Sequence, residues 1–286
     1  MASVAATIQR ITINDVRDMK SKGEKITMLT AYDYTTAKII DRIGIPLILV
    51  GDSLGNVILG YETTLPVTMD VMIHHSKAVV RGTEHAFIIG DMPFMTYHIS
   101  TEDALRNAAR FMQEAGTQAV KLEGGITVAD KVRRIVDCGI PVMGHIGMTP
   151  QSVNQLGGHL VQGKKLEVAK RLIDDAKSLE QAGAFGVVLE CIPSRLAALI
   201  TEQVNIPTIG IGSGPGCDGQ VQVITDILGI SEFIPKHAKH YVELAQTMAQ
   251  AISTYQEEVK SGKFPTKENS FIIDTDVLEQ VKAYIP

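Results

Sequence analysis

Short apolar runs of strand length recur along the chain, and polar or glycine-containing segments separate them. Such runs, rich in β-branched residues, are typical of buried strands. The pattern predicts eight strands, at Thr27–Ala31, Leu47–Gly51, Phe87–Asp91, Ala119–Glu123, Pro141–His145, Gly186–Glu190, Pro207–Ile211 and Gln220–Asp226. The runs are almost continuously apolar, which is typical of strands buried on both faces of a parallel sheet.

Helical patterns lie between several of these runs. The segment Ser100–Gly116 starts with a serine, carries Asp103 three residues later, keeps apolar residues on one face and stops at a glycine. These are start and stop signals of a helix. The segment Lys165–Gly183 has the same character. Eight strands alternating with helices predict an α/β protein, a (βα)8 TIM barrel, with a doubly wound open sheet as the structural alternative.

Three segments fall outside the strand and helix alternation. The insert Gly55–Met69 is too long for an ordinary loop between a strand and a helix, and we expect it to cover something. The segment Lys236–Gly262 has a helical pattern, and Phe264–Pro286 is a tail of mixed character. No linker composition marks a second domain. We predict one barrel domain over residues 1–286, with an N-terminal helical segment and a C-terminal helical extension.

Charge and composition narrow the function. The net charge is −5 and the 27 basic residues are interspersed with 32 acidic ones, which argues against a nucleic-acid partner. No apolar run approaches the roughly 18 residues of a membrane span, and the start of the chain has no apolar export segment. The three cysteines are far apart and indicate neither a disulfide framework nor a zinc site. We expect a cytoplasmic protein with small-molecule ligands and no membrane partner.

Four predicted strands end in an acid, at Asp52, Asp91, Glu123 and Glu190. The carboxyl ends of the strands of a parallel barrel open on one face, so these side chains are expected to meet. Two carboxylates about 4 Å apart repel by about 4 kcal/mol at an effective dielectric near 20, so the cluster requires a cation. Oxygen ligands with few His or Cys nearby favour Mg²⁺ over Zn²⁺. A lone strand-end acid is more often a helix cap or an ion-pair partner, but four in one topology make that improbable for all.

Other polar residues lie close to these acids in the pattern. Lys121 precedes Glu123 by two positions and so points to the same side of its strand, where an ammonium suits a substrate carboxylate. A structural ion pair is an equally good explanation of Lys121. Ser53 could cap the turn after Asp52, and His145 ends the fifth strand, which favours a site role. The glycine-rich segment Ile209–Gly219 lacks GxGxxG spacing and predicts a tight turn beside a ligand.

A series of segments, in this order, resembles the ketopantoate hydroxymethyltransferase family over nearly the whole chain. They are MLTAYDYTTAKIID, LVGDSLGNVILGYETTLPVTMD, GDMPF, VKLEGG, HIGMTPQSVNQLGG, LECIP, IGIGSGPGCDGQV and GKFP. The resemblance implies a (βα)8 barrel that binds Mg²⁺ and assembles as a homodecamer. It departs from the family pattern at His74, Ser213, Gln222 and Asn269, none of which is an expected metal or base position.

The resemblance also implies roles for individual residues. Asp52, Asp91 and Glu123 match the acids that hold the metal, and the first two also belong to the substrate site. Ser53 matches a residue that hydrogen-bonds the oxo-acid carboxylate, and Lys121 matches a substrate-binding cation. Glu190 matches the general base, and His145 matches a histidine near the substrate whose role stays open.

The implied reaction transfers a hydroxymethyl group from 5,10-methylenetetrahydrofolate to 3-methyl-2-oxobutanoate, giving 2-dehydropantoate and tetrahydrofolate through a Mg²⁺-stabilised enolate. It belongs to pantothenate and coenzyme A biosynthesis. A carboxylate with a pKa near 4.3 removes a C–H proton only if the enolate is stabilised in this way. One alternative is a Mg²⁺-dependent lyase or mutase, which would use a reactive cysteine where only Cys191 and Cys217 are available. Another is a non-catalytic sensor, which would lack one of the four acids.

Overall fold

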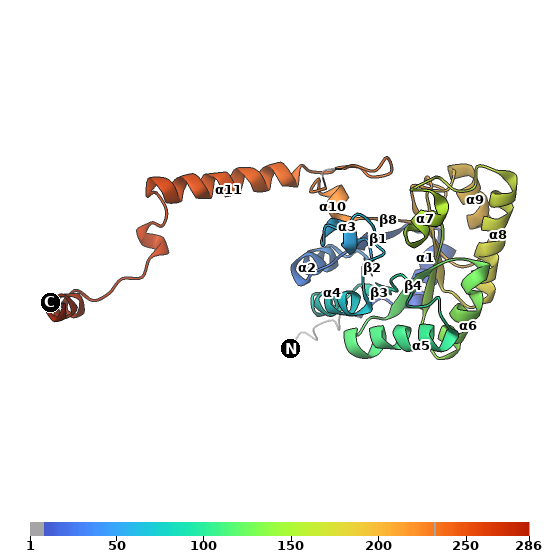
Figure 1. Cartoon of the computed structure of the whole chain (residues 1–286), viewed down its shortest axis with the longest axis horizontal. Helices are drawn as coiled ribbons and strands as arrows, with labels where there is room; N and C mark the ends of the chain where they lie inside the picture. The colour runs from blue at the N-terminus through green and yellow to red at the C-terminus, as the bar shows by residue number, and fades with distance from the viewer. Residues whose placement is uncertain (1–8, 232, 286) are drawn as a thin grey trace, which may run out of the picture.

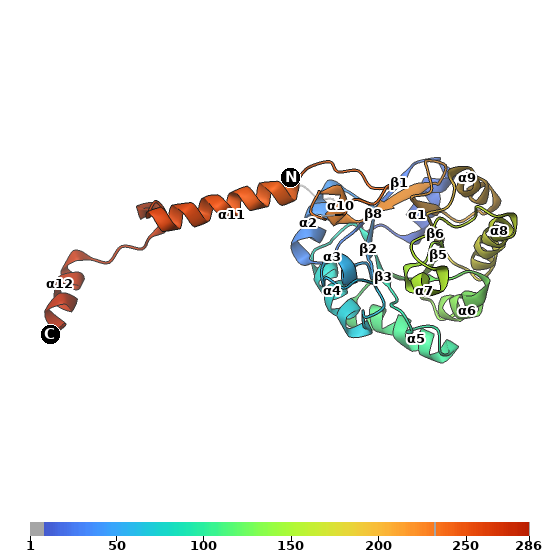
Figure 2. The ribbon, with the colours of Figure 1, turned by 45° about the horizontal axis from the view of Figure 1, so that its top comes forward.

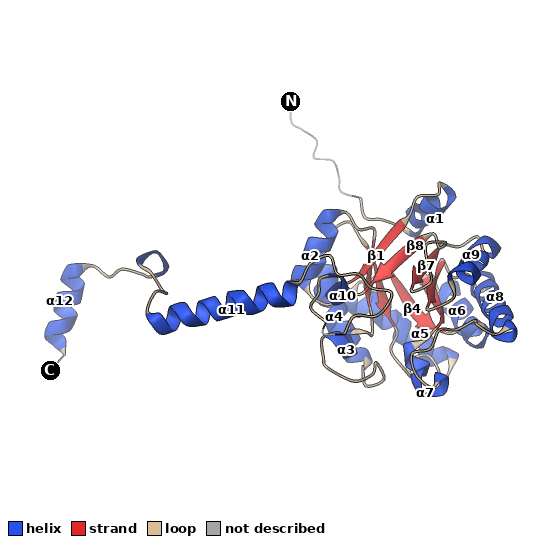
Figure 3. Cartoon of the chain, turned by 90° about the horizontal axis from the view of Figure 1, so that it is seen from above, coloured by secondary structure: helices blue, strands red, loops and turns tan. Residues whose placement is uncertain are grey.

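The computed structural model describes residues 9–231 and 233–285, and its parallel strands form a closed barrel surrounded by helices (Figure 3). The strands pair in chain order and β8 closes the ring onto β1. They are β1 Ile26–Thr30, β2 Leu47–Val50, β3 Phe87–Asp91, β4 Ala119–Glu123, β5 Val142–Gly147, β6 Gly186–Glu190, β7 Thr208–Ile211 and β8 Gly219–Gln222. The predicted (βα)8 barrel is confirmed, and the open sheet is excluded.

The first seven strands lie within two residues of their predicted bounds at each end, whereas the eighth prediction is wrong in its second half. β8 ends at Gln222, and Ile224–Ile227 form the short helix α10. The backbone N–H of Ile224 donates to Thr30 Oγ1 at 3.0 Å, which fixes the start of α10 against β1. A short apolar run with β-branched residues has the same composition in a strand and in a buried helical turn, so the pattern could not separate them.

The inner and outer faces of each strand are both apolar. On β2, Leu47 and Leu49 belong to the cluster inside the barrel, while Ile48 and Val50 belong to the cluster between strands and helices. This alternation follows from the two-residue period of a strand. It explains why the strands have almost continuous apolar sequences: each strand is covered on one side by the barrel interior and on the other by a helix.

Helices occupy the outside of the barrel (Figures 1 and 2). Ahead of α10 they are α1 Ile13–Ser21, α2 Tyr34–Ile43, α3 Leu54–Val57, α4 Met69–Arg81, α5 Thr101–Arg110, α6 Ala129–Asp137, α7 Val153–Leu156, α8 Leu166–Gln181 and α9 Ser194–Gln203. The predicted helix Ser100–Gly116 is α5 followed by a π-helical turn, Phe111–Ala115. Ser100 Oγ caps it by accepting from the N–H of Asp103 at 3.0 Å, and Gly116 ends it with φ +77°.

Helix α1 covers the lower end of the barrel, where the strands begin. Val16 is fully buried and packs into the same apolar cluster as the inner side chains of the strands. Lys20 Nζ donates to the carbonyls of Val204 and Ile206 at 3.1 and 3.0 Å and lies 2.9 Å from Asp218 Oδ2. The predicted N-terminal helical segment is therefore present, although its first residues, 1–8, lie outside the described residues.

The C-terminal helices α11 Leu244–Ser261 and α12 Thr275–Tyr284 extend away from the barrel (Figures 1 and 2). The prediction of helix from Lys236 onward is wrong for Lys236–Glu243, which has no helix. No residue of α11 is buried. Four exposed apolar residues of α11 share one face because they are spaced by four, three and four positions: Met248, Ile252, Tyr255 and Val259. Among the described residues, no helix has both the length and the apolarity to cross a membrane.

Candidate active site

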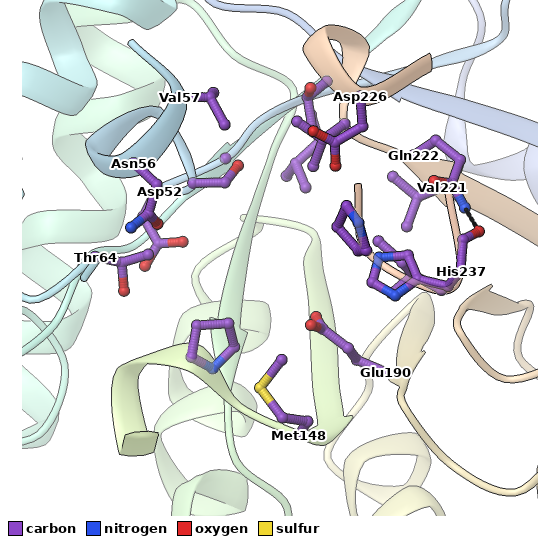
Figure 4. A pocket seen from close by; sticks show the side chains of 18 of the residues that line it. Asp52, Asn56, Val57, Thr64, Met148, Glu190, Val221, Gln222, Asp226 and His237 are labelled. Carbon is purple, nitrogen blue, oxygen red and sulfur yellow. Dashed lines mark hydrogen bonds between the residues drawn. The ribbon is translucent and has the colours of Figure 1, made fainter. Parts of the chain in front are cut away.

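A cavity of about 730 Å³ opens at the carboxyl ends of the strands (Figure 4). Its wall includes side chains from the ends of the barrel strands, from the segment after β2 and from residues 230, 231, 233 and 235–237. Asn56 and Thr64 of the predicted insert Gly55–Met69 line it, in agreement with the expected covering role. The cavity contains all seven predicted site residues: Asp52, Ser53, Asp91, Lys121, Glu123, His145 and Glu190.

The strand period places these polar side chains inside the barrel. On β4, Ala119 belongs to the inner apolar cluster, so Lys121 and Glu123, two and four positions later, point inward as well. On β5, Met143 belongs to the inner apolar cluster. His145 lies two positions later, so it also points inward, at the level of the site. The interior therefore has apolar lower layers and a charged upper layer at the strand ends. The predicted shared orientation of Lys121 and Glu123 is confirmed.

Lys121 and Asp91 form a buried ion pair. The two residues are register partners on β4 and β3, and Lys121 Nζ lies 2.6 Å from each carboxylate oxygen of Asp91. Burial alone would lower the pKa of Lys121, but the negative charges of Asp91, Asp52 and Glu123 outweigh it and raise that pKa. The ammonium thus stays protonated and offsets part of the charge of the acid cluster.

Asp52 lies beside this pair, and its surroundings disfavour the ionised form of its carboxyl group. Its backbone N–H donates to Asp91 Oδ2 at 3.1 Å. Burial and then the negative charge of Asp91 raise the pKa of Asp52 well above its usual value, against the opposing effect of Lys121. Burial and the charge of Asp91 together thus disfavour the ionised form of Asp52 more than Lys121 favours it.

Gln151 connects the acids and was not singled out in the sequence. Its side-chain Nε2 donates to Asp52 Oδ2 at 2.9 Å and its backbone N–H donates to Glu123 Oε2 at 3.1 Å. Tyr97 Oη donates to Gln151 Oε1 at 2.6 Å and accepts from the N–H of Glu123 at 3.1 Å. Residue type and period gave no signal for either residue. Gln151 does lie in the family-like segment HIGMTPQSVNQLGG, which was the one available indication.

Ser53 is held by Tyr32 and does not cap a helix. Ser53 Oγ lies 2.9 Å from Tyr32 Oη, and the side chain makes no cap hydrogen bond to α3. Burial raises the pKa of Tyr32, so its hydroxyl stays protonated. His75, which was given no role, has Nδ1 2.6 Å from the carbonyl oxygen of Tyr32 and supports this residue from α4.

His145 stands between two acids. Its Nε2 lies 3.1 Å from Glu190 Oε2 and its Nδ1 lies 3.6 Å from Glu123 Oε1. Neither ring nitrogen makes a well-directed hydrogen bond, so these are mainly charge contacts. Burial lowers the pKa of His145, but Glu123 and Glu190 outweigh that effect and raise it to about 9. A protonated imidazole here contacts both Glu123 and Glu190.

The backbone around Glu190 is closely packed. The carbonyl oxygen of Glu190 accepts from the N–H of Met148 at 2.9 Å. A Cβ at Gly147, where φ is +102°, would lie 2.2 Å from that oxygen, so a glycine is required. Ser213 Oγ donates to the carbonyl of Leu189 at 2.7 Å and ties the end of β6 to the turn after β7. The next residue, Cys191, has φ +50°, and burial raises the pKa of its thiol to about 11, which argues against the reactive cysteine of a lyase.

The donor set suits a hard divalent cation. In the parts of the chain that the structure describes, no three His, Cys, Asp or Glu side chains converge closely enough to form a metal cage. The chemistry nevertheless fits: Glu123 Oε1 is buried without a hydrogen-bond partner, and Asp52 has a raised pKa beside Asp91. A cation bound at these oxygens would give Glu123 Oε1 a partner and would stabilise the ionised form of Asp52. Carboxylate oxygens without Cys favour Mg²⁺.

Comparisons with known proteins agree with the geometry. The model of the family described as ketopantoate hydroxymethyltransferase matches residues 10–267. A 3-methyl-2-oxobutanoate hydroxymethyltransferase of Dehalococcoides mccartyi is 62% identical over 274 residues, covering 96% of this chain and 97% of that protein. One of Clostridium botulinum is 57% identical over 273 residues, covering 95% and 99%.

Solved structures with a similar fold are far more distant in sequence. Phosphonopyruvate hydrolase has a TM-score of 0.59 at 10% identity and covers 96% of each chain. Oxaloacetate acetylhydrolase has a TM-score of 0.57 at 13% identity and covers 96% of this chain and 99% of that one. At such identities the likeness concerns the fold alone.

Proposed function

Because the chain belongs to the ketopantoate hydroxymethyltransferase family, we propose that it uses 5,10-methylenetetrahydrofolate to hydroxymethylate 3-methyl-2-oxobutanoate. The products are 2-dehydropantoate and tetrahydrofolate, on the route to pantothenate. Curated relatives at 56% and 63% identity are named as hydroxymethyltransferases of this oxo acid, and the chain is a transferase of that kind. The folate donor, the metal and the residue roles below are the proposal.

One observation carries the proposed mechanism: the cavity holds Glu190 apart from the cluster of Asp52, Asp91 and Glu123. Glu190 contacts His145 and is a partly exposed acid at the end of β6, while the cluster lies at the ends of β2 to β4. A base must keep a lone pair free for the proton, so it must not be a metal ligand. The separation gives two acid functions within one cavity.

The oxo acid binds against the charged upper layer. Lys121 and Ser53 bind its carboxylate, and Asp52, Asp91 and Glu123 are the residues that would hold Mg²⁺. When bound, Mg²⁺ supplies Lewis-acid stabilisation of the negative charge that develops on that oxygen. Glu190 takes the proton from C3, and the C–H electron pair enters the enolate. C3 then bonds to the methylene carbon of the donor, a water molecule supplies the hydroxyl oxygen on that carbon, and both of its C–N bonds break with their electron pairs kept by N5 and N10. These two nitrogens take up the proton from C3 and one proton of the water. His145 holds the Glu190 carboxylate in place.

Deuterium exchange tests this proposal. We expect the C3 proton signal of 3-methyl-2-oxobutanoate to disappear in D₂O when the protein and Mg²⁺ are both present, as followed by proton NMR without folate. Addition of 5,10-methylenetetrahydrofolate should then give 2-dehydropantoate. Exchange that needs no Mg²⁺ would contradict the metal role. The lack of both exchange and product would contradict the proposed function.

We further propose that the chain is one barrel domain whose C-terminal extension serves homo-oligomer assembly, a decamer by family resemblance. Helix α10 after β8 is short, and α11 leaves the barrel with its apolar face uncovered. Ile39 and Ile43 of α2 are also exposed, at 56% and 72%. Apolar faces of this kind indicate a protein partner, and another copy of the chain supplies the matching surfaces.

Charged substitutions on α11 test the assembly. Ile252→Glu with Tyr255→Glu should lower the molar mass measured by light scattering, because both side chains lie on the uncovered face, at 64% and 58% exposure. Gln250→Glu with Glu257→Gln, which leaves that apolar face and the net charge intact, is the control. An unchanged mass for the first pair, or a monomeric unaltered chain, would contradict assembly through α11.

A further inference from the structure

A fifth carboxylate lines the cavity and has no part in the proposed metal site or base. Asp226 lies on α10 and points into the same cavity as Asp52 and Glu190 (Figure 4). Only 6% of its surface is exposed. Its Oδ1 accepts from Ser231 Oγ at 2.7 Å, and Oδ2 has no hydrogen-bond partner among the described residues. A carboxylate so deeply buried normally has more partners than one hydroxyl.

No cation pairs with Asp226 in the described part of the chain. The ion pairs of the cavity are those of Asp91 with Lys121 and of His145 with Glu123 and Glu190. A buried charge left in this state is costly, and a ligand that brings hydrogen-bond donors would relieve the cost. Asp226 can therefore accept hydrogen bonds from a ligand bound in the cavity.

Neighbouring polar atoms share this unpaired state. Thr225 Oγ1 and Gln222 Oε1 are buried without hydrogen-bond partners, and both residues line the cavity. Gln222 Nε2 donates to the carbonyl of His237 at 3.2 Å, which turns Oε1 away from that contact (Figure 4). All three residues lie on the β8 and α10 side of the cavity, across from the acid cluster, and Asp226 Oδ2 is the acceptor that is open to a ligand there. This wall of the cavity is therefore polar, and its accessible unpartnered acceptor is the Asp226 carboxylate.

We propose that Asp226 binds the 2-amino-4-oxopyrimidine edge of the folate, a role that rests on the proposed function. That edge has two adjacent donors, the N3–H and the 2-amino group. Their spacing matches a carboxylate in the way that the two N–H groups of a guanidinium do. The site assigns the pterin to the β8 and α10 wall and leaves the oxo acid at the β2 to β4 side.

The cavity has room for both molecules. Its volume of about 730 Å³ lies within the range of about 300–1,000 Å³ for pockets that enclose drug-sized ligands, and the oxo acid is much smaller than those. Ile230 and Pro235 add apolar surface to the cavity wall. Phe233 and Lys236 are exposed at the outer rim, where the tail of the folate would leave the cavity.

The inference is tested by measuring the affinities of the unaltered chain and of Asp226→Asn for tetrahydrofolate and for an analogue that lacks the 2-amino group. We expect Asp226→Asn to raise the Kd for tetrahydrofolate about 30-fold or more, since a charged acceptor for two donors is lost. For the unaltered chain, 2-desamino-2-methyltetrahydrofolate should also bind about 30-fold more weakly. The variant should bind the two ligands almost equally, because the amino group no longer has its partner. Calorimetry provides the four affinities.

Asp175→Asn is the matched control. Asp175 is also 6% exposed but lies outside the cavity and accepts from the N–H of Ile126, so its variant should bind tetrahydrofolate normally. Folate-free deuterium exchange at C3 should persist in Asp226→Asn, which shows that the oxo-acid site is intact. Persistent exchange with unchanged tetrahydrofolate affinity would overturn the pterin assignment and leave the proposed function standing. If the unaltered chain bound tetrahydrofolate and 2-desamino-2-methyltetrahydrofolate equally well, the pterin assignment would be overturned, and this result does not depend on whether Asp226→Asn folds. An unaltered chain that neither exchanges nor binds tetrahydrofolate would overturn both.

Discussion

Glu190→Gln should abolish Mg²⁺-dependent deuterium exchange at C3 and lower turnover at least about 10³-fold. The amide keeps the shape of the side chain but cannot accept the C3 proton, and general-base catalysis contributes roughly 10² to 10⁴ in rate. The effect should fall on kcat, with little change in the affinity for 3-methyl-2-oxobutanoate, because Glu190 lies apart from Lys121 and Ser53. Exchange by NMR and steady-state rates measure the two quantities.

Glu202→Gln provides the control for this experiment. Glu202 is an exposed residue of α9 and does not line the cavity, so its variant should exchange and turn over normally. If Glu190→Gln retained normal exchange, another group would be the base. The partly exposed position of Glu190 makes misfolding an improbable cause of a loss of activity, and unchanged thermal unfolding would confirm this.

Lys121→Met should lower the free energy of unfolding by about 3–5 kcal/mol. Removing one member of a buried ion pair leaves the other charge uncompensated in the interior. Here the loss would expose Asp91 to the charges of Asp52 and Glu123, and the pKa of Asp52 is already raised by burial and by Asp91. The midpoint of urea unfolding measures the change. Oxo-acid binding should be lost as well, since the variant has no ammonium.

An exposed ion pair and a double variant provide the comparison. Lys282 lies 2.8 Å from Glu279 Oε1 with both side chains about 60% exposed, so Lys282→Met should cost less than about 1 kcal/mol. Adding Asp91→Asn to Lys121→Met should restore part of the lost stability, because it removes the uncompensated carboxylate. Equal unfolding midpoints for Lys121→Met and Lys282→Met would show that the buried pair contributes no more than a surface pair.

The strand-end acids were predictable because two simple regularities act together. The period of two residues fixes which side chains of a strand face inward, and a parallel barrel brings all strand ends to one face. From these, the positions of Asp91, Glu123, His145 and Glu190 in one cavity follow from the linear sequence. Asp52 required one more step, because it lies just beyond the end of β2.

Gln151, Tyr97 and Asp226 were not predictable in this way. Gln151 comes from a 3-10 turn after β5 and Tyr97 from the loop after β3, where backbone direction depends on tertiary packing and no strand period applies. Asp226 was placed in a predicted strand, but it lies on α10, and that shift is what turns its side chain toward the cavity. The same ambiguity of a short apolar run therefore produced the one wrong strand boundary and concealed a cavity carboxylate.

The closure of the barrel has a consequence for synthesis on the ribosome. β1 pairs with β8, and Lys20 contacts Asp218 across 198 positions of sequence. Until β8 has left the exit tunnel, β1 has an open edge and α1 lacks its anchoring carbonyls. Unpaired strand edges favour aggregation, and contacts this distant in sequence slow folding. The nascent chain therefore passes most of its synthesis as an incomplete sheet, the stage at which chaperones would be most needed.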